Sequence, residues 1–253
     1  MAGLTHLNKA PIKEAIIAIN VKPETPIDLE KVKAIHQQIA SSYPDVSPIY
    51  MSEIKLRVRN SLPGTESDSS LRGYMFKSAD YIIQMKVDGF IASKLAPYNG
   101  WDSFKEEAFK LWQIYAAVIG EIEGYSRLAV RYINSFEIPM TEKLQFKLEE
   151  YFAEPPHIPE ELGDRLSEFF SRVVIPVPDL NAKVVLVQAS GLAVGDSDKN
   201  KVAFPVIVDI DVYRNSVASF NEEEVWEYIE KLRFFKNKAF FSSITDKTVE
   251  LLK

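Results

Sequence analysis

Two carboxylates stand two residues apart in a segment rich in β-branched residues. Asp209 and Asp211 alternate with Val208, Ile210 and Val212, and residues two apart on a strand point to the same face. Carboxylates paired in this way can hold Mg²⁺ or Mn²⁺. Hard cations usually need further oxygen ligands, however, and the sequence does not indicate where these would come from. Asp209 and Asp211 are therefore candidate metal ligands, with a solvated strand face as the favoured interpretation.

A second pair, of arginines, has strand spacing in the segment 126–138. Arg127 and Arg131 fall on the side opposite the apolar residues, and guanidinium groups fit phosphate and carboxylate well. They are candidate anion-binding residues. The alternative is cross-strand pairing with acids such as Glu53 or Glu137, which the negative net charge favours.

Three further polar or aromatic residues are candidates for ligand binding. Asn134 falls in phase with the apolar side of its strand, and a buried amide must be hydrogen-bonded. We expect it to tie the strand to a neighbour, with a ligand contact as the alternative. Tyr98 and Trp101 flank an Asn99-Gly100 turn, where two aromatic rings could line a pocket or interface, or attach a helix to its sheet.

Standard catalytic motifs are absent from the sequence. It contains no G-x-S-x-G, G-x-G-x-x-G, P-loop or H-E-x-x-H pattern. The three histidines, His6, His36 and His157, have no metal-ligand spacing. We therefore predict no catalytic residue and no cofactor, and we favour a protein that is not an enzyme.

The composition further restricts the kinds of site, the partners and the location that the protein can have. The chain has 253 residues, no cysteine and a net charge of -6, so disulfides and thiolate metal sites are excluded and nucleic-acid binding is disfavoured. The first residues lack the layout of a signal peptide, and no apolar run reaches about 18 residues. We expect a cytoplasmic protein with no membrane contact.

The hydrophobic patterns predict an α+β protein. Strands are expected at 12–22, 49–59, 72–77, 81–87, 90–96, 126–138, 168–177, 182–190 and 202–213. Helices are expected at 28–42, 102–119, 141–153, 221–234 and 244–252. Ser103 with Glu106, and Asn221 with Glu224, have the spacing of capping boxes. Asp88-Gly89 predicts a hairpin turn with positive φ, and the polar stretch 60–71 predicts a loop.

The order of these elements suggests an internal duplication. Residues 1–124 give β-α-β4-α and residues 125–253 give β-α-β3-α, either as two halves or as one continuous domain. Antiparallel strands with helices packed on one face are the natural architecture for such a unit. The order matches TATA-binding-protein-like and helix-grip folds, an analogy of topology that transfers no function.

Several segments together resemble a known family. They are LNKAPIKEAIIAINV, KLAPYNGWDSFKEEAFKLWQIY, SRLAVRYINSFEIP and FFSSITDKTVELL, and their most specific parts are PY-x-x-W (Pro97, Tyr98, Trp101) and RLAVRYIN (Arg127, Arg131, Tyr132, Asn134). Over nearly its whole length the chain resembles an uncharacterised, sporadically distributed family of bacterial and archaeal proteins of about 250 residues. The resemblance implies no activity. Sporadic distribution resembles that of horizontally moved genes, such as defence or toxin-neutralising systems.

Two function classes follow from these observations. The favoured one is a non-catalytic module that binds a partner protein or self-associates, within a defence or toxin-neutralising system. The alternative is a small-molecule-binding protein, or an enzyme with an unrecognised site, that uses a pocket between helix and sheet. A third interpretation is a saddle-like surface that binds nucleic acid, which the negative net charge disfavours.

Overall fold

The computed structural model describes residues 7, 9–59, 62–140, 147–159, 161, 166–190, 203–217 and 221–253, with side chains described outside 53–67. The first half contains β1 (Ile12–Pro23), α1 (Leu29–Ala34), α2 (His36–Ile39), β2 (Asp45–Arg59), β3 (Leu62–Lys77), β4 (Tyr81–Lys86), β5 (Gly89–Leu95) and α3 (Trp101–Ile119). The second contains β6 (Ile122–Pro139), η1 (Leu148–Glu150), β7 (Phe170–Val177), η3 (Pro178–Leu180), β8 (Ala182–Ser190), β9 (Ala203–Val217), α4 (Glu222–Ser243) and α5 (Asp246–Leu251).

The described strands form one antiparallel sheet in the order β2-β3-β4-β5-β1-β6-β9-β8-β7. At its centre β1 pairs with β6 along almost the whole length of β1. Each of these two strands has the last strand of its own half as its other neighbour, β5 beside β1 and β9 beside β6. The predicted α+β class with an antiparallel sheet is therefore confirmed, and the two halves share a single sheet.

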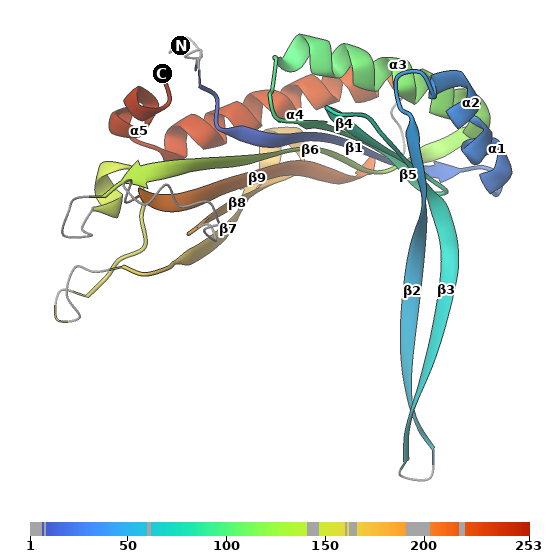
Figure 1. The fold of residues 1–253 in the computed structure, drawn as a ribbon, viewed down its shortest axis with the longest axis horizontal. Coiled ribbons are helices and arrows are strands. Elements are labelled where there is room, and N and C mark those ends of the chain that lie inside the picture. Colours follow the sequence, from blue (N-terminus) through green and yellow to red (C-terminus); the bar gives the residue numbers. More distant parts are fainter. Residues whose placement is uncertain are drawn as a thin grey trace.

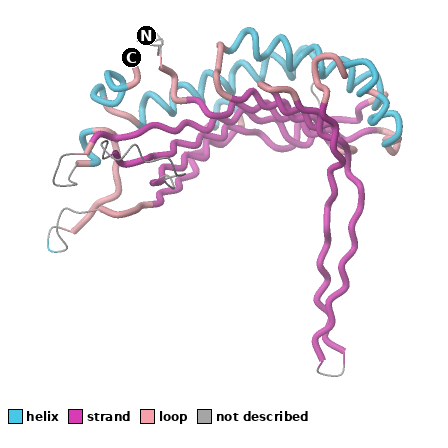
Figure 2. Tube along the Cα trace, in the orientation of Figure 1, coloured by secondary structure: helices cyan, strands magenta, loops and turns pink. Residues whose placement is uncertain are grey.

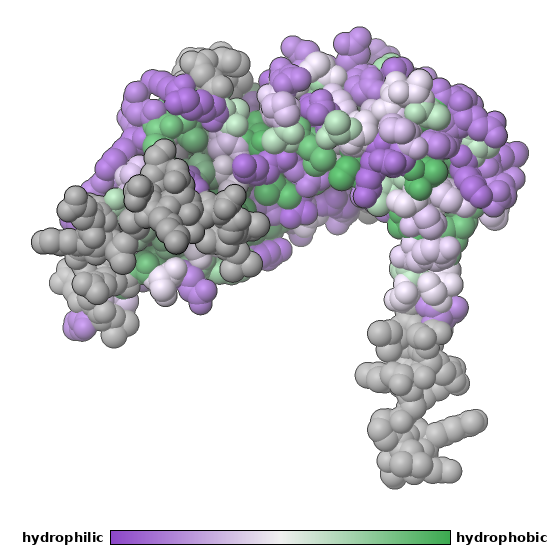
Figure 3. All heavy atoms as spheres, in the orientation of Figure 1, coloured by the Kyte–Doolittle hydropathy of each residue, from purple (hydrophilic) through white to green (hydrophobic). Residues whose placement is uncertain are grey.

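The helices lie on one face of this sheet (Figure 1, Figure 2). Helix α3 packs on the first half, against β5, whereas α4 packs on β6, β9 and β8. The opposite sheet face carries no helix among the described elements (Figure 1). The outer surface of the helical layer is largely hydrophilic (Figure 3), as expected for amphipathic helices that bury one side.

Alternation along the strands explains which face the helices cover. On β1, Ile17 and Ile19 are fully buried, as are Leu128 and Val130 on β6. The matching stripe of α3 consists of residues at helical spacing that are also buried: Phe104, Ala108, Leu111, Trp112, Tyr115 and Ile119. Burying a large apolar side chain contributes roughly 1.5–3 kcal/mol, so this layer supplies most of the driving force for folding. No described helix is long and apolar enough to cross a membrane.

A two-stranded arm projects from the end of the sheet (Figure 1). Strands β2 and β3 pair with each other from Asp45–Lys77 to Arg59–Leu62. Strand β4 pairs with β3 only between Gly73 and Lys77. Beyond that point the arm has no third strand among the described residues. The loop predicted at 60–71 is thus wrong for 62–71, because this polar stretch is held in β3 by its register with β2.

Two predicted helical features are corrected by the structure. The predicted helix 141–153 is wrong where it can be compared, since only a 3₁₀ turn (Leu148–Glu150) forms and 141–146 lie outside the described residues. The predicted cap at Ser103 is also wrong, because α3 begins earlier, with Gly100 as its N-cap. The capping box of Asn221 and Glu224 is confirmed at the start of α4.

The hairpin predicted around Asp88-Gly89 forms, but the reason for a glycine at position 89 differs from the predicted one. The two-residue turn is Val87-Asp88, since Lys86 pairs with Gly89, and neither turn residue nor Gly89 has positive φ. A Cβ on Gly89 would lie 2.8 Å from the carbonyl oxygen of Ile19. Glycine is needed there because β1 approaches closely, not because the turn is left-handed.

Candidate functional site

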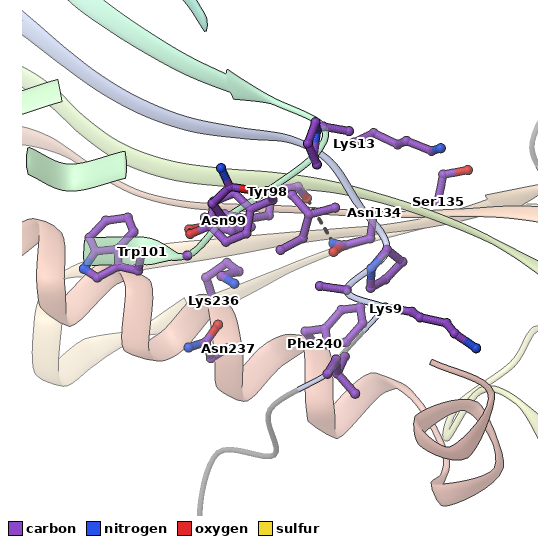
Figure 4. A pocket seen from close by; sticks show the side chains of 18 of the residues that line it. Lys9, Lys13, Tyr98, Asn99, Trp101, Asn134, Ser135, Lys236, Asn237 and Phe240 are labelled. Carbon is purple, nitrogen blue, oxygen red and sulfur yellow. Dashed lines mark hydrogen bonds between the residues drawn. The ribbon is translucent and has the colours of Figure 1, made fainter. Parts of the chain in front are cut away.

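A pocket of about 670 Å³ lies on the helical side of the sheet (Figure 4). Its walls come from four separate stretches: the residues around the start of β1, the loop before α3, the middle of β6, and the second half of α4. The volume falls in the range of small-molecule sites. Three of the residues predicted to bind a ligand, Tyr98, Trp101 and Asn134, line it together.

The loop before α3 brings the first two of these residues into place. Gly100 has φ of 127°, a conformation that side-chain-bearing residues rarely adopt. The chain therefore turns sharply between Tyr98 and Trp101, as the Asn99-Gly100 pair predicts. Trp101 is then the first residue of α3 and is 5% exposed.

Trp101 is fixed by a carboxylate on α4. Its indole Nε1 donates to both Glu230 oxygens at 2.9 Å, and Lys105 Nζ donates to the same carboxylate at 2.6 Å. Burial opposes ionisation of Glu230, but these hydrogen bonds hold its pKa below the usual value. The Arg233 guanidinium lies over the Trp101 ring, 5.3 Å from its centroid. This cluster joins α3 to α4 at one end of the pocket.

Two tyrosines that line the pocket contact each other. The hydroxyl oxygens of Tyr98 and Tyr132 are 2.6 Å apart, and their rings meet edge to face. Burial raises the pKa of Tyr98 to about 12 and raises that of Tyr132 as well. Both phenols are therefore protonated at neutral pH. One hydroxyl donates to the other, which leaves one hydroxyl hydrogen of the pair for a ligand.

Asn134 has the hydrogen bonds expected of a buried amide. It is 3% exposed, and its Nδ2 donates to the carbonyl oxygen of Val208 on β9 at 2.9 Å. The amide thereby ties β6 to β9. It also lines the pocket, so the structural role and the candidate ligand contact occur in the same residue.

A lysine on α4 completes the pocket from below (Figure 4). Lys236 is 7% exposed, and its Nζ lies 3.5 Å from the centroid of the Tyr132 ring. Burial, followed by the nearby charge of Arg233, lowers the pKa of Lys236 to about 7. Among the described residues no carboxylate forms an ion pair with it.

The charge of the pocket is opposite to that of the protein. The chain has 36 acidic and 30 basic residues, yet the described residues around the pocket include four cations and no carboxylate: Lys9, Lys13, Arg233 and Lys236. Lys9 and Lys13 are exposed at its mouth, whereas Lys236 lies inside. A low-dielectric cleft lined by one sign of charge attracts ligands of the other sign.

The remaining predicted site residues meet on the opposite face of the sheet. Arg131 forms two hydrogen bonds to Asp209, at 2.8 and 2.5 Å, and Arg127 donates to Asp211 at 2.7 Å. The two candidate pairs are thus partners of each other rather than separate anion and metal sites. The described residues contain no cluster of three or more side chains able to hold a metal ion.

These ion pairs border a shallow cavity of about 520 Å³ on the open face. The Arg127 guanidinium also lies 4.6 Å from the centroid of the Tyr213 ring. Burial raises the pKa of Asp211, against the charges of Arg127 and Arg131. Arg127 and Arg131 are each matched by an acid, and Arg172, which also lines the cavity, adds one positive charge without an ion pair among the described residues. The surface therefore has a smaller excess of charge with which to select a ligand than the helical-side pocket has.

Sequence reasoning missed the lysine that distinguishes the helical-side pocket. The helix predicted at 221–234 continues to Ser243. Extending its apolar spacing from Ile229 and Leu232 leads to Lys236 and then to Phe240, both of which are buried. A lysine within an apolar helical stripe is a signal that could have identified the residue.

The comparisons with known proteins assign no function to the chain. No protein-family model and no curated protein matches it. The resemblance to an uncharacterised, sporadically distributed family stays a prediction.

Proposed function

We propose that this protein binds a small molecule bearing a carboxylate or phosphate group in the pocket between α3, α4 and the sheet. The observation that carries the proposal is the excess of positive charge in the described lining of an acidic protein. Arg233 lies 3.9 Å from Glu230, which is not a lining residue, whereas Lys9, Lys13 and Lys236 have no ion pair among the described residues. Of the two predicted function classes, the pocket favours the small-molecule alternative.

The lining offers two kinds of contact to such a ligand. Lys9 and Lys13 at the mouth can attract and hold the anionic group. Tyr98, Tyr132 and Trp101 offer aromatic surface, and the pair of phenols has one hydroxyl hydrogen left to donate. A mostly apolar cleft with a few convergent polar groups is the usual design of a ligand site.

Calorimetric titration tests this proposal. Pyruvate, lactate, 2-oxoglutarate and glycerol 3-phosphate serve as probes of small carboxylates and phosphate esters. We expect at least one to bind, and the variant Lys9→Ser/Lys13→Ser to bind it at least roughly tenfold more weakly, equivalent to about 1.4 kcal/mol.

A lysine at the other end of β1 supplies the matched control. Lys22 is exposed and pairs with Glu123, 3.4 Å away, so Lys22→Ser removes a positive charge without touching the pocket. Equal weakening by Lys22→Ser, or no binding of any probe to the wild type, contradicts the proposal.

A second candidate function is the binding of a partner protein through the β2–β3 arm. Isolated two-stranded hairpins are marginally stable in water, and the paired residues from Tyr50–Leu71 to Arg59–Leu62 have no third strand among the described residues. At the root of the arm, Tyr50 is 61% exposed and Met51 is 44% exposed. Such an arm is suited to packing against another chain, including a second copy of this one.

Shortening the arm separates this candidate from the first. A variant in which residues 51–70 are replaced by a short turn retains the whole pocket, because no pocket residue lies in that segment. Sedimentation at several concentrations reports self-association, and co-purification from the host reports a stoichiometric partner. The candidate requires that the wild type associates and the shortened variant does not.

The finer fold and location predictions also remain proposals. Strands β1 and β6 pair at the centre of the sheet, and each has the last strand of its own half as its other neighbour, which supports an internal duplication. The TATA-binding-protein-like order has less support, because only a 3₁₀ turn is described where the second half would need its first helix. The absence of cysteine favours a cytoplasmic location. Neither proposal bears on which ligand the pocket binds.

A further inference from the structure

Lys236 differs from the other cations of the pocket in its surroundings. It is 7% exposed, whereas Lys9 and Lys13 are exposed at the mouth. Buried lysines are rare unless a carboxylate neutralises them. The glutamate nearest to Lys236 in the sequence of α4, Glu230, instead contacts Trp101 and Lys105 and lies 3.9 Å from Arg233.

Burial and the charge of Arg233 favour the neutral form of Lys236. Arg233 lies on the same helix, three residues earlier. The Nζ of Lys236 lies against the face of the Tyr132 ring, 3.5 Å from the centroid, a contact that by itself favours the ammonium form. Desolvation and a neighbouring cation both lower the pKa of an amine, here to about 7. At neutral pH a large share of Lys236 is therefore a free amine.

A free amine in a desolvated site is a nucleophile toward carbonyl carbon. Lysines activated by an apolar pocket or by an adjacent cation form Schiff bases with carbonyl substrates. Lys236 is itself buried, has Arg233 as an adjacent cation and lines a cavity large enough for a small ligand. The Tyr98 and Tyr132 hydroxyls, 2.6 Å apart, line the same cavity, and the hydroxyl hydrogen that the pair does not use internally can hydrogen-bond to the carbonyl oxygen of a ligand.

We propose that Lys236 forms an imine with a small oxo acid that is held in the pocket by its anionic group. The inference rests on the proposed function, because Lys9 and Lys13 supply the attraction for the anion. To form the imine, the Nζ lone pair of Lys236 attacks the carbonyl carbon of the oxo acid and gives a carbinolamine. Loss of one water then leaves a carbon–nitrogen double bond, with no net oxidation or reduction.

Trapping with a hydride donor tests the proposal on the intact protein. The wild type is incubated with glyoxylate or pyruvate and sodium cyanoborohydride, which reduces an imine to a stable secondary amine. Peptide mass spectrometry then locates the adduct. We expect Lys236 to be labelled at least roughly tenfold faster than Lys231, an exposed lysine on the same helix.

The pH dependence of labelling provides an independent readout. Labelling of Lys236 should rise as pH increases through about 7 and then level off, because the free amine is the reactive form. The titratable and charged groups that line the same pocket are Arg233, Tyr98, Tyr132, Lys9 and Lys13. A rate that keeps rising up to the range of an ordinary lysine overturns the proposal.

Two variants and one pair of ligands make the outcome decisive. Lys236→Met should lose the adduct, and Lys231→Met should keep it. Lactate matches pyruvate in its carboxylate but lacks the carbonyl. Binding of both with no adduct at Lys236 overturns the imine and leaves the proposed function standing. If neither binds and no adduct forms, both proposals fail.

Discussion

Replacing Lys236 by methionine should stabilise the protein, and the gain should depend on pH. Methionine has nearly the same length as lysine and no charge. It can occupy the space beside Tyr132 without desolvating an ammonium group. The same reasoning that makes Lys236 reactive thus predicts that it destabilises the folded state.

The magnitude follows from the difference in pKa between the two states. The pKa of Lys236 falls from 10.5 in the unfolded chain to about 7 in the folded one. At about 1.4 kcal/mol per pH unit, this corresponds to an upper limit of about 5 kcal/mol. Because the group is buried and its surroundings can relax, we expect a gain of roughly 2–5 kcal/mol at pH 7 and below.

The sign of the pH dependence is fixed by proton counting. Between about pH 7 and 10.5 the unfolded chain binds a proton at Lys236 that the folded chain does not. The free energy of unfolding of the wild type therefore rises with pH in this window. The variant lacks this contribution, so its advantage should be complete below pH 7 and shrink as pH approaches 10.

Urea unfolding of the two proteins at about pH 6.5, 8 and 9.5 measures the difference directly. Lys231→Met, an exposed substitution on the same helix, is the control and should track the wild type at every pH. An advantage for Lys236→Met that does not change with pH would show that packing rather than charge burial is responsible. A variant less stable than the wild type at all pH values would refute the reasoning altogether.

Three other substitutions test the fold. Gly73→Ala should destabilise by about 2 kcal/mol or more, because its Cβ would lie 2.2 Å from the Met85 carbonyl oxygen; an unchanged urea midpoint would contradict this close approach. Asn221→Ala should lower the free energy of unfolding by about 1 kcal/mol through loss of the capping box. An unchanged urea midpoint, followed by the helical circular-dichroism signal, would show that the cap does not stabilise α4. A double-mutant cycle on Arg131 and Asp209 should give a coupling below about 1 kcal/mol, since the arginine side chain is 44% exposed; a coupling of several kcal/mol would show that solvent screens the pair less than its exposure implies.

Local patterns in the sequence were enough to predict most strands and helices of the core. The alternation around Val208 and Ile210 and the stripe of α3 each report directly which side of an element is buried. The loop prediction was wrong for 62–71 because the Ser, Thr, Gly and Asp residues of this stretch are typical of loops. There, pairing with β2 satisfies the backbone and overrides that local tendency.

Local patterns could not predict the pocket, because the segments that form its walls are far apart in the sequence. Tyr98 and Trp101 were predicted as a possible pocket lining, and Asn134 as a possible ligand contact, from local spacing alone. Their meeting with Lys236 depends on α4 crossing over β6 and β9, which is a tertiary arrangement. Likewise, Arg131 and Asp209 could each be placed on a strand face, but their pairing depends on the β6–β9 register.

The two faces of β6 show why the helical side is the better place to look for function. Arg131 and Tyr132 are neighbours in sequence but point to opposite faces. On the open face the arginine is matched by Asp209, so its charge is explained by the fold. On the helical face Tyr132 contacts Lys236, a buried cation with no carboxylate partner among the described residues. A methionine at that position would pack at least as well and should give a more stable protein, so stability alone gives no reason for an amine there. Groups that break the rules of a well-packed core are commonly found at functional sites, and a ligand that needs an amine explains Lys236 where the fold does not.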